Sequence, residues 1–557
     1  MPKFILIDQS LRDLGGHHYP YAHTVLSAAQ RAGWQPVLAV NRRFRQRAAL
    51  PVPWRVHSLY AHESYSRHTL DTQALAAAQF AHAAAAPRRA LAGWWRARLR
   101  RRRAADFARD CARLFALEPL ARGDVVFLAT MSELDLWGLS AFLKGSGIGL
   151  DCDWHLQFHF GVFHGREPDY GAQHDAAQAM RDSLAGALHQ SGAQRLHFHC
   201  TTEQLAAQYQ SLGVARFTTL PYPVHELFQP RPRSQAAPLR IACLGHSRRE
   251  KGYGLLPPLL RTLWDEWFGR ARAQLVLQTH HPRQRRRLEH LVRSLTPAGS
   301  AVPPALDFAG FPLPLAGYAA LLCSADVGLM LYDATRYYAR CSGVLLEMLC
   351  AGVPVLVPAG GWLAAQIESV NQAYLDGIAT GCAAPVPLAD DGWVPLPASA
   401  GAVLLACEWR AEAEPGEYLR LEFSAEGAAG AGAPPAQVIL GARDAPLPVR
   451  CLLPLPPGCR RLRVTAHNAW RPAAAPAARF EWSVVPEAPP MGALGLTIAA
   501  ASELPRLLRD LLDHAEHYRL RTRTHAGACA HAHSGLQVLA GLGVNAVADI
   551  AGERATT

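Results

Sequence analysis

The chain has 557 residues, half of them apolar and 18% charged, which predicts three or four globular domains with sizeable cores. Lys and Arg exceed Asp and Glu by 56 to 45, and the net charge of +11 indicates contact with something anionic without naming it. No apolar run of about 20 residues lacks a charge or a proline, and the twelve cysteines form no CxxC pair, so the sequence argues against a transmembrane helix, a zinc site and a disulfide framework.

The first half of the chain alternates predicted strands with predicted helices. Residues 4–8 (FILID) indicate a buried strand that follows directly on the first residues, without the pattern of a signal peptide, so we expect a reduced, cytosolic compartment. A Gly-Gly turn and a helix come next, and further strands are predicted at residues 35–40, 124–130 and 154–160. This alternation implies parallel βαβ units in a doubly wound sheet, which we place in a first domain of residues 1–224.

A proline-rich, polar stretch at residues 221–238 indicates a linker, after which the pattern of strands and helices restarts. We expect a second αβ domain whose first part covers residues 225–379. From about residue 390 the pattern changes to short alternating strands, such as residues 417–423 (EYLRLEF), separated by Gly, Pro and Ala turns. Strands at intervals of about 8–12 residues are typical of an antiparallel sandwich.

Helical signals return at residues 502–520, where Ser502 is a plausible N-cap. We therefore expect a β domain at residues 380–488 that is inserted in the second αβ domain, and we assign residues 489–557 to the last part of that domain and a tail. The β domain contains tryptophans that could bind glycans, although we favour a place in the core for most of them. They are Trp393, Trp409, Trp470 and Trp482.

One apolar stretch, residues 341–355 (CSGVLLEMLCAGVPV), contains a single carboxylate, Glu347. Ser342 is a good N-cap and Gly352 a good C-terminal stop for a short helix, whose first backbone N–H groups and dipole suit a phosphate. Glu347 lies about one turn further in, where it could accept two hydroxyl hydrogen bonds, as from a ribose. On this stretch alone, a glutamate that simply reaches solvent from an amphipathic helix is an equally good interpretation.

A basic segment, residues 244–256 (LGHSRREKGYGLL), lies between a predicted strand and a predicted helix. Ligands bind at such carboxyl ends of strands in open α/β sheets. Arg248, Arg249 and Lys251 could therefore hold a diphosphate, and Gly252 would allow close approach of the backbone. The alternative is a solvated basic loop.

The turn after the first strand contains Gly15 and Gly16, which would allow close approach to a phosphate or a sugar but lack the full dinucleotide fingerprint. His17 and His18 follow and could be mere turn residues. His159 lies near the carboxyl edge of a later strand, where a lone histidine is more often structural than functional.

Taken in order, the Gly-Gly turn, the REKG segment of residues 249–252 and the stretch SGVLLEMLCAGVPVLVP of residues 342–358 resemble the GT-B glycosyltransferases, specifically the family 4-like group of retaining, nucleotide-sugar-dependent enzymes. The resemblance covers most of residues 1–375 and roughly residues 490–535. It implies an α/β protein with two Rossmann-like, doubly wound domains that face each other across a cleft. The donor would bind mainly to the second domain and the acceptor mainly to the first.

The resemblance also implies roles for individual residues. Glu347 looks like the second glutamate of the family's Glu-x7-Glu motif, which holds the ribose, and Lys251 looks like its phosphate-binding lysine. The catalytic candidates are His159, which would contact the donor sugar, together with Lys251, Arg248 and Arg249, and the donor-binding candidates are Gly15, Gly16, Gly245, Gly252, Ser342, Gly343, Val344 and Glu347. No metal ligands and no further cofactor are implied, since cations and helix-end amides would stabilise the diphosphate of a UDP- or GDP-linked donor.

Two positions depart from the family pattern. The first glutamate of the motif would fall at Ala339, with Arg340 beside it, and this position usually meets hydroxyls of the transferred sugar. The family's arginine upstream of the lysine would align with His246, and either Arg248 or Arg249 could take its place.

The implied activity is transfer of a hexose from a nucleotide-sugar donor to a glycan or lipid-linked acceptor, in cell-surface polysaccharide or glycoconjugate synthesis. The alternative is a non-catalytic GT-B scaffold that binds a glycan or a nucleotide. Ala339 favours the scaffold, whereas Glu347 and Lys251 argue against it. A third hypothesis, a GT-B sugar epimerase, requires acid and base carboxylates near the cleft, and the sequence alone does not place them.

Eight arginines fall in the segment from Arg88 to Arg103, which also contains Trp94 and Trp95. A basic helix with interfacial tryptophans can lie on anionic lipid, which would place the protein peripherally on the inner face of the membrane. A solvated basic face explains the segment equally well. Nucleic-acid binding has no supporting fold signal, so we expect no nucleic-acid partner.

Overall fold

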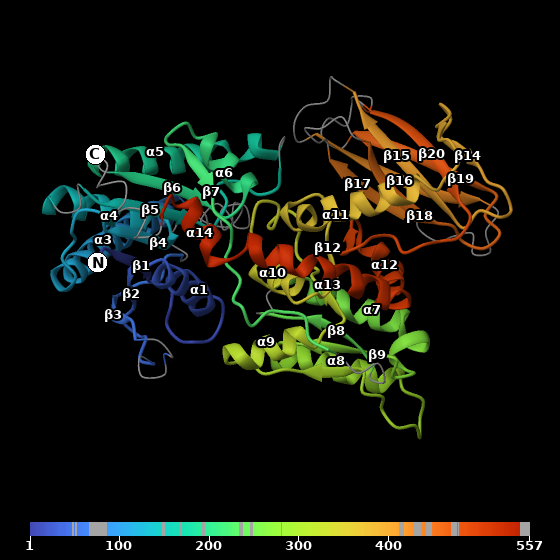
Figure 1. Ribbon diagram of the computed structural model, residues 1–557, viewed down its shortest axis with the longest axis horizontal. Coiled ribbons are helices and arrows are strands. Elements are labelled where there is room, and N and C mark those ends of the chain that lie inside the picture. Colours follow the sequence, from blue (N-terminus) through green and yellow to red (C-terminus); the bar gives the residue numbers. More distant parts are fainter. Residues whose placement is uncertain are drawn as a thin grey trace.

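A computed structural model of the chain describes residues 1–46, 50, 53–65, 86–147, 151–166, 169–191, 195–232, 238–245, 249–279, 281–410, 417–426, 436–441, 448–468, 476 and 478–545 (Figure 1). Of residues 86–96, 169, 249 and 441 only the backbone is described. Trp470 and His246, which the sequence singled out, lie outside these ranges.

The first domain is a seven-stranded parallel sheet in the order β3-β2-β1-β4-β5-β6-β7. Its central strand β1 (Lys3–Asp8) is apolar on both faces, since Phe4 and Leu6 pack toward α1 (His18–Arg31) while Ile5 and Ile7 pack toward the helices of the opposite face. The other strands are β2 (Gln35–Asn41), β3 (Arg55–Tyr60), β4 (Val125–Met131), β5 (Asp153–Phe158), β6 (Leu196–Cys200) and β7 (Phe217–Thr219). The opposite face is covered by α3 (Ala86–Leu117), α4 (Glu133–Ser146), α5 (His174–Ser191), which follows the 3-10 turn η2 (Asp169–Gln173), and α6 (Glu203–Gln210).

The second domain is a six-stranded parallel sheet in the order β10-β9-β8-β11-β12-β21. Its strands are β8 (Leu239–Cys243), β9 (Ala273–Leu277), β10 (Leu306–Phe308), β11 (Val327–Leu329), β12 (Val355–Pro358) and β21 (Gly495–Ile498). Its first helical elements are η3 (Arg249–Lys251), η4 (Tyr253–Leu255), α7 (Leu256–Thr262), η5 (Trp264–Phe268), α8 (Pro282–Leu295) and α9 (Leu315–Cys323). Next come α10 (Gly343–Cys350) and α11 (Trp362–Ala379), and after β21 come η6 (Ala501–Glu503), α12 (Leu504–Asp513), α13 (Ala515–Ala532) and α14 (Gly535–Gly541).

Two antiparallel four-stranded sheets lie between α11 and β21 in the chain, and they form the β-sandwich at the upper right of Figure 1. Their orders are β13-β20-β15-β18 and β14-β19-β16-β17. Along β16 (Tyr418–Glu426), Leu419, Leu421 and Phe423 point into the core between the sheets, as the alternating pattern predicts. The remaining strands are β13 (Val386–Pro387), β14 (Trp393–Pro395), β15 (Ala402–Trp409), β17 (Ala436–Gly441), β18 (Val449–Pro454), β19 (Arg461–Asn468) and β20 (Ala478–Val485).

The predicted architecture of two Rossmann-like domains with an added antiparallel sandwich is therefore confirmed. The residue limits of the four predicted segments stay a prediction. Trp409 and Trp482 are partly buried against the sandwich core, in line with the interpretation of the tryptophans as core residues. The prediction for Ser502 is wrong, because Ser502 lies inside the 3-10 turn η6 and the following helix α12 begins only at Leu504.

The C-terminal helices join the two αβ domains (Figure 1). α13 packs against α10 of the second domain, and α14 packs against α1 of the first. The backbone N–H of Val224 donates to His533 O at 2.8 Å, and the Trp34 indole donates to Asn545 O at 3.0 Å. A single apolar core accordingly runs from α1 through α10 to α14.

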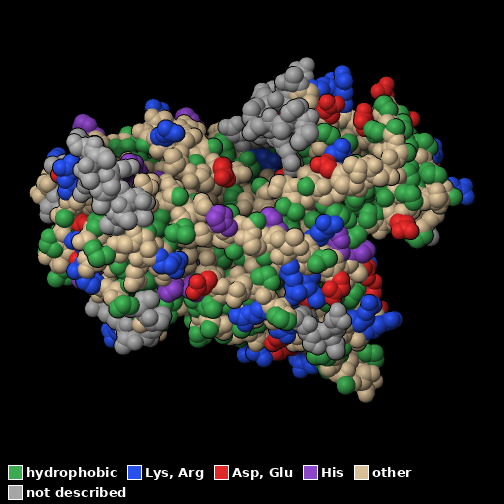
Figure 2. All heavy atoms as spheres, viewed as in Figure 1, with side chains coloured by type: hydrophobic (Ala, Val, Ile, Leu, Met, Phe, Trp, Pro, Cys, Tyr) green, Lys and Arg blue, Asp and Glu red, His purple; other side chains and the backbone are tan. Residues whose placement is uncertain are grey.

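Arg166 connects three parts of the molecule. Its guanidinium lies 3.7 Å from the ring centroid of Tyr418 in the sandwich, and it donates to Gly360 O in the second domain at 2.5 Å. On the face shown in Figure 2 the surface is hollowed between the first domain and the sandwich. The sandwich therefore contacts the first domain through a side chain and not only the domain in which it is inserted.

Candidate functional site

A cavity of about 490 Å³ lies between the two αβ domains. Residues that follow β1 and β5 line it from the first domain, and residues that follow β8 and β11 line it from the second, together with the start of α10. The carboxyl ends of both parallel sheets thus face one space, which is where ligands bind in open α/β sheets.

The cavity brings together most of the residues that the sequence singled out. Its lining includes Gly16, His159, Gly245, Lys251, Ser342, Gly343, Val344 and Glu347. Gly15 lies beside it, because a Cβ added there would be 3.0 Å from Pro312 of the opposite domain. Gly252 does not line the cavity, and Arg248 falls outside the described residues. Arg249 begins η3, but its side chain is not described.

The start of α10 and Lys251 form the basic side of the cavity. Ser342 caps the helix, with its side chain accepting from Leu345 N at 3.4 Å, as predicted. The ammonium of Lys251 lies next to Gly245, where an added Cβ would be 2.7 Å from Nζ, and 4.8 Å from the ring centroid of Tyr332. A cation and a positive helix end that face the same space suit an anionic group such as a diphosphate.

Glu347 lies in α10 and faces the cavity, with only 5% of the residue exposed. The interpretation of Glu347 as a solvent-facing residue is therefore wrong. The Tyr318 hydroxyl donates to Glu347 Oε2 at 3.0 Å and fixes the orientation of the carboxylate. Burial raises the pKa of Glu347 to about 7, although the Tyr318 hydrogen bond and the charge of Lys251 act in the opposite direction.

The raised pKa of Glu347 predicts a stability that falls as the pH rises. Between its ordinary value of 4.5 and about 7 the folded protein holds a proton that the unfolded chain has released, so raising the pH through this window destabilises the fold. At 1.36 kcal/mol per pH unit the loss amounts to about 3 kcal/mol. We expect the free energy of unfolding of Glu347→Gln, relative to that of the wild type, to increase by this amount between pH 5 and pH 8. Chemical denaturation at each pH measures both values. A difference that does not change with pH would contradict the prediction.

His159 is held as a neutral imidazole. Its Nε2 is 2.7 Å from Ala129 O, which can only accept, so Nε2 carries the proton. Burial lowers its pKa to about 4. The backbone N–H of His159 donates to the Tyr65 hydroxyl at 3.0 Å. Contact with a donor sugar stays a prediction, and the nitrogen that remains for such a contact is Nδ1.

Ala339, where the resemblance would place the first glutamate of the motif, does not line the cavity. Ala339 is buried among core residues of the first domain, and its carbonyl accepts from Thr202 Oγ1 at 2.7 Å. Arg340 lines the cavity instead, with its guanidinium 4.6 Å from the ring centroid of Phe160. At this position, therefore, Arg340 and not Ala339 faces the cavity.

The structure adds to the site a pair of residues for which the sequence predicted no role there. His18, one of the two histidines interpreted as possible turn residues, is the first residue of α1, and its Nδ1 lies 2.8 Å from Asp8 Oδ2. Both residues line the cavity. Asp8 ends β1, so its place at the carboxyl end of a strand was a signal that the sequence did contain.

No family model matches the chain, and no curated protein matches it. Solved structures to which it is similar include the N-terminal domain of Candida albicans trehalose-6-phosphate phosphatase, at 11% identity and a TM-score of 0.43, covering 66% of this chain and 87% of that one. A structure described as "Trehalose-6-phosphate from E. coli bound with UDP-2-fluoro glucose" gives 14% identity and a TM-score of 0.40 over 66% and 86% of the two chains. The α,α-trehalose 6-phosphate synthase from Burkholderia multivorans gives 11% identity and a TM-score of 0.41, covering 66% of this chain and 86% of that one. Similarity at this level concerns the fold, and membership of the family 4-like group stays a prediction.

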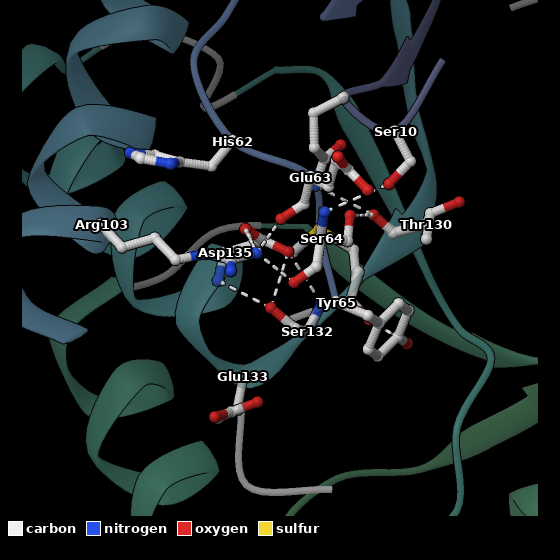
Figure 3. A network of polar contacts seen from close by, with 12 residues as sticks. Ser10, His62, Glu63, Ser64, Tyr65, Arg103, Thr130, Ser132, Glu133 and Asp135 are labelled. Carbon is white, nitrogen blue, oxygen red and sulfur yellow. Dashed lines mark hydrogen bonds and ion pairs between the residues drawn. The ribbon is translucent and has the colours of Figure 1, made fainter. Parts of the chain in front are cut away.

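A network of polar contacts holds the segment of residues 61–65, which brings Glu63 and Tyr65 to the cavity (Figure 3). Arg103 of α3 donates to the carbonyls of Glu63 and Ser64, and its guanidinium is 3.8 Å from the carboxylate of Asp135. Asp135 completes the N-cap of α4 by accepting from the backbone and hydroxyl of Ser132. Burial raises the pKa of Asp135, and the charge of Arg103 opposes this shift.

The described part of the arginine-rich helix does not present all its arginines to solvent. Arg103 is buried and Arg100 lies 3.2 Å from Glu133 of α4, whereas Arg98, Arg101 and Arg102 are exposed. The side chains of Arg88, Trp94 and Trp95 lie outside the described residues.

Within the described ranges, no three or more His, Cys, Asp or Glu side chains are grouped so that they could hold a metal ion. None of the helices in these ranges combines the length and the apolar character needed to cross a bilayer.

Proposed function

We propose that the protein is a glycosyltransferase that moves a hexose from a nucleotide-sugar donor to a glycan or lipid-linked acceptor. The observation that carries the proposal is the convergence of Lys251, the start of α10 and the buried Glu347 on one cavity between two Rossmann-like domains. A helix start and a lysine suit a diphosphate, and a buried carboxylate suits the two hydroxyls of a ribose. Together these groups match the parts of a nucleoside diphosphate.

The catalytic role proposed for these residues is electrostatic stabilisation of the leaving group. As the bond between the sugar and the diphosphate breaks, negative charge develops on the departing oxygen, and Lys251 and the amides of residues 342–344 would stabilise it. Arg248 or Arg249 would add a second cation. The resemblance implies retention of the anomeric configuration and no need for a metal ion, since these cations supply the charge.

The acceptor and the location belong to the proposal as well. We place the activity in cell-surface polysaccharide or glycoconjugate synthesis, in the cytoplasm or peripherally on the inner face of the membrane. Arg98, Arg101 and Arg102 support contact with an anionic surface because they are exposed, whereas Arg100 and Arg103 face α4.

A non-catalytic scaffold that binds a nucleotide or a glycan is the second candidate. The observation that favours it is Ala339, which offers the cavity no carboxylate for a sugar hydroxyl. A scaffold would bind a nucleotide without turning over its sugar, so product analysis separates the two. A free sugar epimer without transfer would point instead to an epimerase, for which Asp8 and Glu63 supply carboxylates at the cavity.

The test is a thermal-shift panel with UDP, GDP, ADP and their glucose conjugates, run on the wild type and on Glu347→Ala. A ligand that binds only the folded state raises the melting temperature with its concentration. We expect one nucleotide to do so, and Glu347→Ala to bind it about 100-fold more weakly, because two hydrogen bonds to a charged group are lost. The matched control is Glu516→Ala, whose side chain is 69% exposed on α13. If no nucleotide shifts the wild type at millimolar concentration, the transferase proposal fails.

A further inference from the structure

The pair formed by His18 and Asp8 has the geometry of an oriented base. Asp8 is 1% exposed, its Oδ1 accepts from Ser10 N at 3.0 Å, and its Oδ2 is 2.8 Å from His18 Nδ1. A carboxylate only accepts, so in the neutral imidazole Nδ1 carries the proton and Nε2 keeps its lone pair. His18 is 25% exposed and lines the cavity, and no hydrogen bond joins its Nε2 to another residue of the described ranges.

The charged groups around His18 shift its pKa upward. Burial acts to lower its pKa, but the charge and hydrogen bond of Asp8 and the charge of Glu63 raise it, and the net direction is upward even with Arg12 opposing. The other titratable groups near it are His17, with ring centroids 4.2 Å apart, and His159, whose own pKa is about 4. A higher pKa makes the imidazole a stronger proton acceptor, which is the property that a general base requires.

Three other titratable side chains of the cavity are less suited to this role. His159 donates from Nε2 to Ala129 O, and its low pKa makes it a weak base. Glu63 pairs with Arg12 at 2.6 Å. Glu347 belongs to the second domain, where Tyr318 and Lys251 surround it. His18 instead lies on the first domain, as do Ser10 and Tyr65, which also line the cavity.

We propose that His18 is the general base that accepts the proton of the acceptor hydroxyl, and that Asp8 is the residue that positions it. This inference rests on the proposed function and adds a proton acceptor to a site whose other groups serve the donor. Nε2 takes the proton while the acceptor oxygen forms a bond to the anomeric carbon. The bond from that carbon to the diphosphate oxygen breaks, and its electron pair leaves with the nucleoside diphosphate.

The proton balance closes when His18 releases the proton to water after the product forms. Attack opposite the leaving group would invert the anomeric configuration, and attack on the same face would retain it, so the configuration of the product is a separate readout. The chemical class of acceptor is a hydroxyl compound in either case.

The experiment compares the wild type with His18→Gln, Asp8→Asn and the control His290→Gln, an exposed histidine of α8. The probe is the UDP-, GDP- or ADP-glucose that raises the melting temperature of the wild type, with water as the acceptor and release of the nucleoside diphosphate as the signal. We expect His18→Gln to bind the donor like the wild type but to hydrolyse it about 100-fold more slowly, since general base catalysis contributes at least this much. His290→Gln should match the wild type in both.

The pH profile separates a positioning role of Asp8 from a structural one. For the wild type, kcat should rise with pH as His18 loses its proton, and this acid limb should move to lower pH in Asp8→Asn, because the group that raises the pKa of His18 is gone. The same downward movement is expected for the His18 ring resonances in an NMR titration, which needs no activity.

Each other outcome has a distinct meaning. If His18→Gln binds and hydrolyses the donor at the wild-type rate with an unchanged acid limb, the base proposal is overturned and the proposed function stands. If His18→Gln loses donor binding together with turnover, His18 is a ligand of the donor and the base proposal is again overturned. If the wild type binds no donor at all, the proposed function fails, and this inference fails with it.

Discussion

Replacing Gly252 with alanine is expected to lower the free energy of unfolding by about 3–5 kcal/mol. Gly252 has a φ of +70°, and a Cβ at this position would lie 2.0 Å from Leu331 O and 2.5 Å from Leu331 Cβ. Because the nearest atom belongs to the backbone of the segment that follows β11, the clash cannot be relieved by rotating a side chain. Chemical denaturation followed by far-UV circular dichroism measures the effect.

Gly254→Ala is the matched control, because it lies two residues further on and an added Cβ there meets no atom within 4 Å. We expect it to change the stability by less than about 1 kcal/mol. Gly252→Ala should also weaken donor binding in the thermal-shift panel, since it displaces the backbone next to Lys251. Equal effects of the two substitutions on stability would show that the approach to Leu331 does not constrain this loop.

Replacing Arg103 with methionine is the second change with a large expected effect, again about 3–5 kcal/mol. Arg103 is 6% exposed and connects the carbonyls of Glu63 and Ser64 to the carboxylate of Asp135 (Figure 3). Its removal leaves Asp135 buried without its cation, so the pKa of Asp135, which burial already raises, should rise further. Urea denaturation at neutral pH measures the loss.

Two further variants test the cause of this loss. Arg102→Met removes an exposed arginine of the same helix and should stay within about 0.5 kcal/mol of the wild type. In Arg103→Met combined with Asp135→Asn neither charge of this pair remains, and the amide can still accept from Ser132 N, so this double variant should be more stable than Arg103→Met alone. A double variant less stable than Arg103→Met would argue against an uncompensated charge as the cause.

The sequence predicted those parts of the site that depend on local pattern. Ser342, the helix behind it and Glu347 lie within one short stretch, where a single acid in an apolar helix stands out. The alternation of Leu419, Leu421 and Phe423 likewise identified a sandwich strand, because side chains in a strand alternate between its faces. Such signals need no knowledge of which segments meet in space.

The remaining features depend on contacts between distant segments. The hydrogen bond from Tyr318 to Glu347 joins two helices, and the backbone of Ala339 is drawn into the first domain by Thr202. The burial of Arg103 could not be predicted because a run of arginines offers no apolar contrast that identifies the inner face of a helix. His18 looked like a turn residue because its partner Asp8 lies at the end of another element.

The C-terminal helices give this fold a particular order of completion during synthesis. β21, the edge strand of the second sheet, follows the whole sandwich in the chain, and α14, which covers α1, follows later still. A nascent chain that has finished the sandwich therefore still lacks a strand of the second sheet and the helix that shields the first. Both αβ domains reach their final buried surface only after β21 and then α14 have been synthesised. Loss of the C-terminal segment would thus expose apolar surface on the first domain, at the opposite end of the sequence.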